Sequence, residues 1–131
     1  TSNMKLLFIV FIFFGFGTGY AANWEKVNGT PVGSSYVDVE SLKKRNNVVS
    51  YTRLFDYLNP SPIGVSSSIS KFTVDCISEK ITWIGSVYYS KNMGKGKIIK
   101  EGVFNRRLYA RPDSIDYATM KFVCNYKQMT T

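Results

Sequence analysis

The stretch "ISKFTVDC", residues 69–76, alternates apolar and polar side chains with a period of two. Phe72, Val74 and Cys76 fall on one side of it, which is the pattern of a half-buried β-strand. The cysteine is therefore expected to point into the core. Ser78 and Glu79 follow as a turn, so this strand is expected to lead directly into another one.

The segments on both sides of this strand also have strand patterns. "KITWIGSVYY", residues 80–89, follows the turn, a further strand covers residues 97–103, and "VVSYTRLFDYL", residues 48–58, comes before. In residues 80–89 the alternation places four side chains on one face: Ile81, Trp83, Val87 and Tyr89. The spacing of these segments is that of an antiparallel meander.

The first half of the chain carries further strand and turn signals. Arg53 and Leu54 interrupt the alternation of their strand, so both of its faces are expected to be partly covered. Residues 24–27 predict a short strand, and Asn28-Gly29 predicts the tight turn that closes it. A helical turn is expected over residues 39–44.

The pattern changes to a helical period in "RPDSIDYATMKFVCNYK", residues 111–127. Pro112 and Asp113 supply a start signal, with Asp113 as the expected N-cap. Asp116 lies where a negative charge suits the first turn of a helix. The fold class predicted is therefore α+β, with an antiparallel meander packed against a C-terminal α-helix.

Cys76 and Cys124 are the only cysteines of the chain. In an exported protein they are expected to form one disulfide, which would tie the helix to the strand that carries Cys76. A bridge over a loop of that length stabilises the fold by about 4 kcal/mol in the chain-entropy model. Two free thiols or half of a metal site are the alternatives, but the chain contains no histidine, and no metal site is predicted.

The N-terminus has the three-part pattern of a secretory signal peptide. Lys5 precedes the gapless apolar run of residues 6–14, and small residues follow at Gly19-Tyr20-Ala21. We expect residues 1–21 to be an N-terminal extension and signal peptide, and residues 22–131 to be a single domain. An uncleaved membrane anchor is the alternative, although nine apolar residues are fewer than the ~20 that span a bilayer.

The composition argues against an enzyme. Without histidine there is no histidine-based nucleophile activation. The closest acidic pairs are explained by a turn and by a helix start, so no catalytic residue and no cofactor is predicted. The glycine-lysine loop in "YYSKNMGKGK", residues 88–97, does not have the phosphate-loop spacing, because Lys95 is followed by Gly96 and no hydroxyl residue follows. We interpret this loop as a glycine-containing hairpin turn.

Positive charge is concentrated in one part of the chain. Loss of Lys5 with the signal lowers the net charge from +8 to +7, and residues 91–111 alone carry seven basic residues against one acid. The candidate binding residues are Lys91, Lys95, Lys97, Lys100, Arg106 and Arg107. Such a cluster raises the local concentration of anionic partners. Protection of an edge strand against aggregation is an alternative role. Nucleic acid is not expected, since neither a recognition helix nor a stacking sheet is evident.

The order of several motifs resembles the bacterial surface-adhesin protein E-like family. The matched features are Trp24, "YVDVESLKK", "SSSISKFTVDC", "YYSKNMGKGKII" and "YARPDSIDYATMKFVC". The resemblance implies a small exported domain without enzyme activity, whose relatives bind host extracellular-matrix and serum glycoproteins such as vitronectin and laminin. It also implies a Gram-negative bacterium, with the protein in the periplasm, at the cell surface or secreted.

Two functions therefore remain open. The first is an adhesin-like binding domain that engages acidic or sulfated extracellular glycoproteins through the basic hairpin, by which we mean the segment that carries the six candidate lysines and arginines. The second is a structural or accessory protein of the cell envelope that acts through contacts with another envelope protein, or as a homodimer. In neither case is a transmembrane segment expected after signal cleavage.

Overall fold

The structure, a computed structural model, describes residues 22–127. The predicted extension and signal peptide, residues 1–21, lies outside the described residues. The elements in chain order are β1 (Trp24–Thr30), β2 (Gly33–Asp38), the 3-10 helix η1 (Val39–Ser41), β3 (Lys43–Arg45), β4 (Val48–Tyr57), β5 (Ser67–Asp75), β6 (Lys80–Lys91), the 3-10 helix η2 (Asn92–Gly94), β7 (Lys95–Tyr109) and α2 (Ile115–Cys124).

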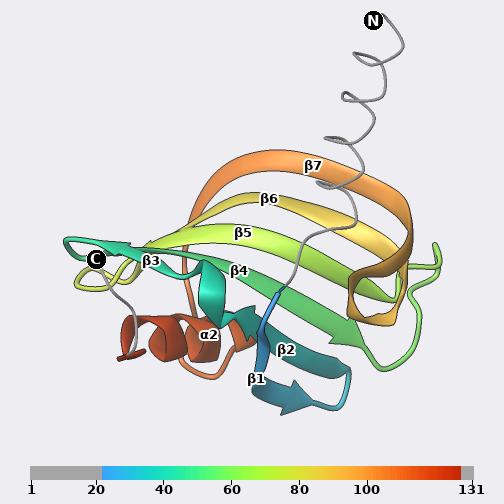
Figure 1. The fold of residues 1–131 in the computed structure, drawn as a ribbon, viewed down its shortest axis with the longest axis horizontal. Helices are drawn as coiled ribbons and strands as arrows, with labels where there is room; N and C mark the ends of the chain where they lie inside the picture. The colour runs from blue at the N-terminus through green and yellow to red at the C-terminus, as the bar shows by residue number, and fades with distance from the viewer. Residues whose placement is uncertain (1–21, 128–131) are drawn as a thin grey trace, which may run out of the picture.

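The strands form a seven-stranded antiparallel sheet in the order β1-β2-β4-β5-β6-β7 (Figure 1). Neighbours in the sheet follow one another along the chain, which confirms the predicted meander. The exception is β3, which pairs with the first residues of β4, while β2 pairs with its last residues. The helical turn expected over residues 39–44 is therefore shorter than predicted, because the chain returns to the sheet at Lys43.

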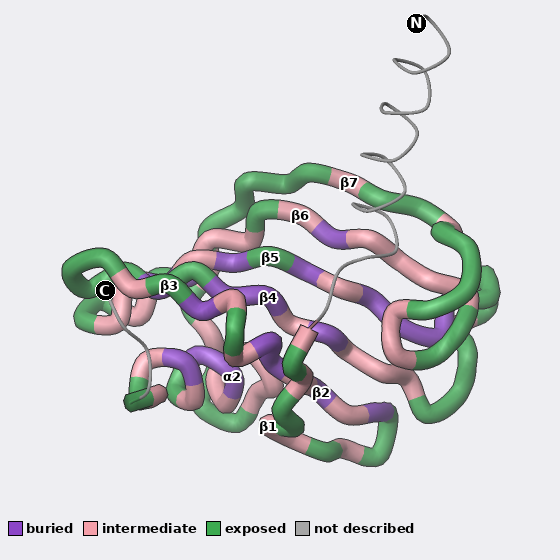
Figure 2. Tube along the Cα trace, in the orientation of Figure 1, coloured by how far each residue is buried: buried purple, intermediate pink, exposed green. Residues whose placement is uncertain are grey.

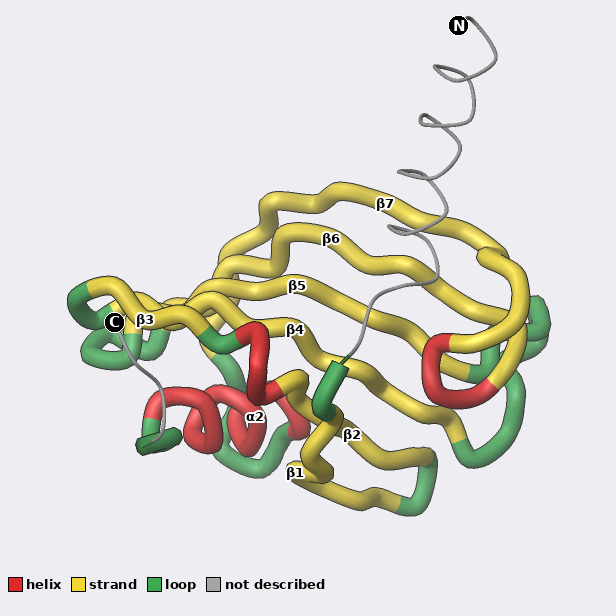
Figure 3. The backbone as a smooth tube through the Cα atoms, viewed as in Figure 1, coloured by secondary structure: helices red, strands yellow, loops and turns green. Residues whose placement is uncertain are grey.

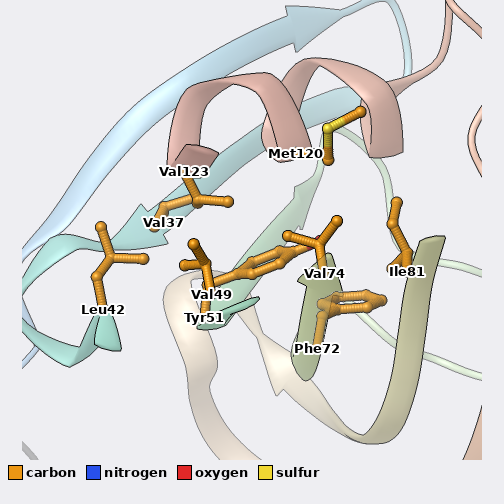
Figure 4. Packing of buried hydrophobic residues seen from close by; sticks show 9 residues of the cluster. All are labelled: Val37, Leu42, Val49, Tyr51, Phe72, Val74, Ile81, Met120 and Val123. Carbon is orange, nitrogen blue, oxygen red and sulfur yellow. The ribbon is translucent and has the colours of Figure 1, made fainter. Parts of the chain in front are cut away.

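Helix α2 covers one face of the sheet, and the main core lies between them. Figure 4 shows Met120 and Val123 of the helix facing the side chains of the strands. Those side chains come from several strands: Val37, Val49, Tyr51, Phe72, Val74 and Ile81. The rings of Tyr51 and Phe72 stack with their centroids 5.3 Å apart. The α+β architecture predicted from the change of period is thus confirmed.

The disulfide between Cys76 and Cys124 is present, with the Cα atoms 5.8 Å apart. It joins the turn after β5 to the last residue of α2, as the sequence predicts. A second link between helix and sheet is the ion pair of Arg53 with Asp116. The guanidinium of Arg53 also lies over the ring of Phe72, at 4.8 Å from its centroid. Both ends of the helix are therefore fastened to the sheet.

The sequence places Ile81, Trp83, Val87 and Tyr89 on one face of β6, and this prediction is wrong for Val87 and Tyr89. The pairing of β6 with β5 shifts between Lys71 and Phe72, which places Ile84 in a β-bulge. A bulge adds one residue to one strand and so reverses the side on which the following side chains lie. In consequence Ser86 and Tyr88 share the helix-side face with Trp83, whereas Val87 and Tyr89 face the other way.

Two local predictions are also corrected. Asn28-Gly29 is part of β1, and the turn to β2 lies at residues 31–32. Asp113 does not cap the helix; the hydroxyl of Ser114 accepts a hydrogen bond from the amide of Tyr117 at 3.1 Å. Both the serine and the aspartate are good capping residues, so the sequence signal was displaced by one position.

Candidate functional site

The connection between β6 and β7 is an ordered turn that folds back over the sheet (Figure 3). The carboxylate of Asp56 accepts hydrogen bonds from the side-chain amide of Asn92, at 3.0 Å, and from the backbone amide of Met93, at 2.7 Å. The hydroxyl of Ser67 accepts one from the amide of Gly94 at 2.8 Å and donates one to the carbonyl of Lys91 at 2.6 Å. The loop is thus fixed to β4 and β5.

The glycines of this loop have structural roles. Gly94 has φ = 71°, and a Cβ added there would lie 2.8 Å from a side-chain carbon of Ile69. Gly96 has φ = 81°, a conformation that favours glycine. The loop therefore needs these glycines to pack against the sheet. It also covers the face opposite α2 around Leu54, as expected from the broken alternation of β4.

The first three candidate lysines gather at this end of the sheet. Lys91 and Lys95 lie directly opposite each other across the β6-β7 pair. Like charges in that arrangement repel and destabilise the sheet. Lys97 follows two residues later, where its amide donates a hydrogen bond to the hydroxyl of Ser90 at 2.9 Å. All three side chains are exposed, so this end of the hairpin presents unshielded positive charge.

The other three cations are divided between the two faces of β7. Lys100 pairs with Tyr88 and Arg106 pairs with Trp83, which places both on the helix-side face. Arg107 pairs with Thr82 and lies on the opposite face. The structure therefore does not bring all six candidates together, because side chains alternate along a strand. The sequence cluster is continuous along the chain but not in space.

None of the six cations has an ionic partner within residues 22–127. The salt bridges there join other groups: Arg53 to Asp116, Arg111 to Asp113 and Lys121 to Glu79. All six side chains are exposed on the outermost strand or at its connection to β6, which appears largely green in Figure 2. A cluster of cations that is not neutralised by the protein itself is available to an external anion.

Aromatic rings accompany the cations on the helix-side face, although the sequence pattern did not predict them as part of a site. The ammonium of Lys100 lies 4.9 Å from the centroid of Tyr88. The rings of Trp83 and Phe104 stack with centroids 4.1 Å apart. The sequence signal that points to this face is Gly85, since a glycine inside a strand often marks a bulge. A bulge there places Tyr88 on the same face as Trp83. A Cβ at Gly85 would lie 2.7 Å from the carbonyl oxygen of Gly102.

The described residues contain neither a metal-binding group of side chains nor a membrane-spanning helix. Between residues 22 and 127, acidic and cysteine side chains form no group of three that could hold a metal ion. In the same part of the chain, no helix has the length and apolar character needed to cross a bilayer. The basic hairpin itself presents exposed ammonium and guanidinium groups, two of them beside aromatic rings.

Solved structures of Haemophilus influenzae protein E have a similar fold. Crystal form II of Haemophilus influenzae protein E has a TM-score of 0.57 and 16% identity, covering 80% of this chain and 96% of that one. Protein E from non-typeable Haemophilus influenzae has a TM-score of 0.53 and 18% identity, covering 82% of this chain and 78% of that one. At these identities the likeness concerns the fold.

Comparison with curated proteins yields no match. The family model described as surface-adhesin protein E, in contrast, matches residues 24–125. The matched range begins at the first residue of β1 and ends just after α2, so it includes the sheet, the helix and the disulfide. The motif order in the sequence, the fold and this match agree, and the chain belongs to the surface-adhesin protein E family.

Proposed function

We propose that this protein is an exported, adhesin-like binding domain that engages acidic or sulfated extracellular glycoproteins through its basic hairpin. Membership of the surface-adhesin protein E family supports an adhesin-like, non-enzymatic role. The observation that carries the proposal is the set of six exposed cations without ionic partners among the described residues. We infer a location outside the cytoplasm of a Gram-negative bacterium, in the periplasm, at the cell surface or secreted.

The cross-strand pair of Lys91 and Lys95 adds a physical argument. Two like charges opposite each other weaken a hairpin unless an anion lies between them. An extended polyanion such as heparin, or an acidic segment of a glycoprotein, could supply that anion. The exposed ammonium groups would gain Coulomb energy on its approach, and the gain would fall as salt screens the charges.

Charge reversal at the hairpin tests the proposal. Lys95→Glu, Lys97→Glu and Lys100→Glu together are expected to leave the fold intact and to lower the salt concentration at which the protein elutes from a heparin column. The matched control reverses three exposed cations on β1 and β3, namely Lys26, Lys43 and Arg45. Both variants change the net charge equally, so a difference between them reports the site. Equal elution of the two variants would contradict the proposal.

One observation favours the second function, an envelope protein acting through protein contacts. β7 is a long edge strand, and Val103 on it is 85% exposed. Together with Ile84, which is 40% exposed, it forms part of an apolar depression on the face opposite α2. An exposed edge can pair with a strand of another chain. Sedimentation would show a concentration-dependent dimer if that chain is a second copy.

A further inference from the structure

Helix α2 packs against one end of its face of the sheet, and a groove of about 360 Å³ lies beside it on the same face. The helix packs where β4 begins and β5 ends, around Val49 and Val74. The groove lies where β4 ends and β5 begins, and the N-terminal turn of the helix closes one side of it at Ser114, Ile115 and Asp116. The sheet face is therefore divided into a core and an open site.

Aromatic side chains form the walls of this groove. Phe55 and Tyr57 stand on β4 with their ring centroids 5.1 Å apart. Trp83 and Tyr88 face them from β6, on the far side of β5. Burial raises the pKa of the Tyr57 phenol, and the neighbouring Tyr88 raises it further. Tyr57 and Tyr88 thus line the same groove from two strands, β4 and β6.

The floor of the groove is made of hydroxyl groups where a core would have aliphatic side chains. Ser68, Ser70 and Ser86 line it, and all three are buried. The indole of Trp83 donates a hydrogen bond to the hydroxyl of Ser86 at 2.9 Å, and the hydroxyls of Ser70 and Ser86 bond to each other. Within the described residues, no hydrogen bond engages the Ser68 hydroxyl, which remains open to a ligand.

The charge around the groove is positive. Arg53 and Asp116 line one end and neutralise each other as an ion pair. Lys100 projects over the ring of Tyr88, and Arg106 lies on the same face beside Trp83. Neither of these two cations has a carboxylate partner within residues 22–127. The rim therefore adds two uncompensated charges to a groove of rings and hydroxyls.

We propose that this groove binds one or two rings of an acidic saccharide, such as a uronate or a sulfated sugar. The C–H faces of the sugar lie against the rings of Tyr57 and Tyr88, its hydroxyls reach the serine floor, and its carboxylate or sulfate is held by Lys100. Ligand sites typically combine apolar walls with a few placed polar groups. This proposal rests on the proposed function, because it assigns a saccharide to part of the same basic surface.

A saccharide fits the groove better than an acidic peptide does. The floor is the face of paired strands, whose backbone amides and carbonyls are already engaged in the β4-β5 and β5-β6 ladders. An extended peptide needs free backbone partners at a sheet edge for its own hydrogen bonds. A sugar carries its hydroxyls around a ring, and it can bond to side-chain hydroxyls without any free backbone group.

Titration calorimetry with a short ligand tests the groove. The probe is a sulfated, uronate-containing disaccharide prepared from heparin, with cellobiose as the neutral comparison and tetraglutamate as the acidic peptide. Tyr88→Ala is expected to weaken binding of the sulfated disaccharide about tenfold, as for loss of a central aromatic contact. Tyr88→Phe keeps the ring and should bind the sulfated disaccharide as the unchanged protein does. Tyr109→Ala is the matched control, because Tyr109 is 67% exposed on the opposite face of β7.

A second pair of variants keeps the test valid if Tyr88→Ala does not fold. Lys100→Gln removes the exposed charge at the rim, and Lys71→Gln removes an exposed charge from the opposite face of β5. Only the first should weaken disaccharide binding. Equal effects, equal binding of cellobiose, or equal binding of tetraglutamate would each overturn the groove proposal. Those outcomes would not change how the charge-reversal variants elute from the heparin column. Failure of the groove proposal is therefore distinguishable from failure of the proposed function of the basic hairpin.

Discussion

Removal of the disulfide is the perturbation whose effect can be worked out most directly from this structure. The bridge joins Cys76 to Cys124 over a sequence separation of 48 residues. In the chain-entropy model, a closed loop of that length restricts the unfolded chain enough to stabilise the fold by about 4 kcal/mol. Since small domains are stable by only about 5–15 kcal/mol, this is a large share of the total.

The double variant Cys76→Ala/Cys124→Ala is therefore expected to lose about 4 kcal/mol of unfolding free energy. For a domain of this size, 1 kcal/mol corresponds to about 4–8 °C, so the Tm should fall by about 20 °C. Helix α2 should be affected first, because the bridge holds its last residue to the sheet. The ion pair of Arg53 with Asp116 would still hold the other end of the helix.

Urea unfolding followed by circular dichroism measures the loss. The unchanged protein under reducing conditions should match the double variant, and the double variant should not respond to reductant. This second comparison is the control for effects of the alanines themselves. A loss below about 1 kcal/mol would refute the reasoning, since it would mean that the bridge does not restrict the unfolded chain as the model requires.

Two further predictions concern packing and pH. Gly33→Ala is expected to destabilise the fold by about 2 kcal/mol, because its Cβ would lie 2.3 Å from the carbonyl oxygen of Asp56. Gly29→Ala is the matched control in urea unfolding, since the nearest neighbour of its Cβ would be 3.6 Å away. Equal stability of the two variants would contradict the argument. Burial raises the pKa of the Tyr51 phenol. The Tyr51 phenol of the unfolded chain loses its proton near pH 10, whereas in the folded protein it stays protonated. The free energy of unfolding therefore falls as pH rises above about 10. Tyr51→Phe should make that fall shallower, and an unchanged slope would count against this explanation.

The parts of the fold that follow from local pattern could be predicted from the sequence. Alternation identified β4, β5 and β6, and the change to a helical period identified α2. The disulfide followed from having two cysteines in an exported chain. The basic cluster was also visible, because it is contiguous along the chain.

The parts that depend on neighbours could not. Alternation in β6 predicts one face for Trp83 and Val87, but the bulge at Ile84 separates them. β7 was expected only over residues 97–103, whereas it covers Lys95–Tyr109. Its polar, basic residues lack a strand pattern, since an edge strand with both faces exposed has no buried side to mark it.

The sequence by itself determined the class of fold, the disulfide and the concentration of positive charge, because each depends on residue types and their order along the chain. Only the tertiary structure decided which cations share a face. Lys100 and Arg106 lie with the aromatic rings of the groove, whereas Arg107 lies on the other side of the same strand. The physical reason is that register and bulges arise from pairing between strands, so a continuous run of charge becomes separate surfaces when the sheet forms.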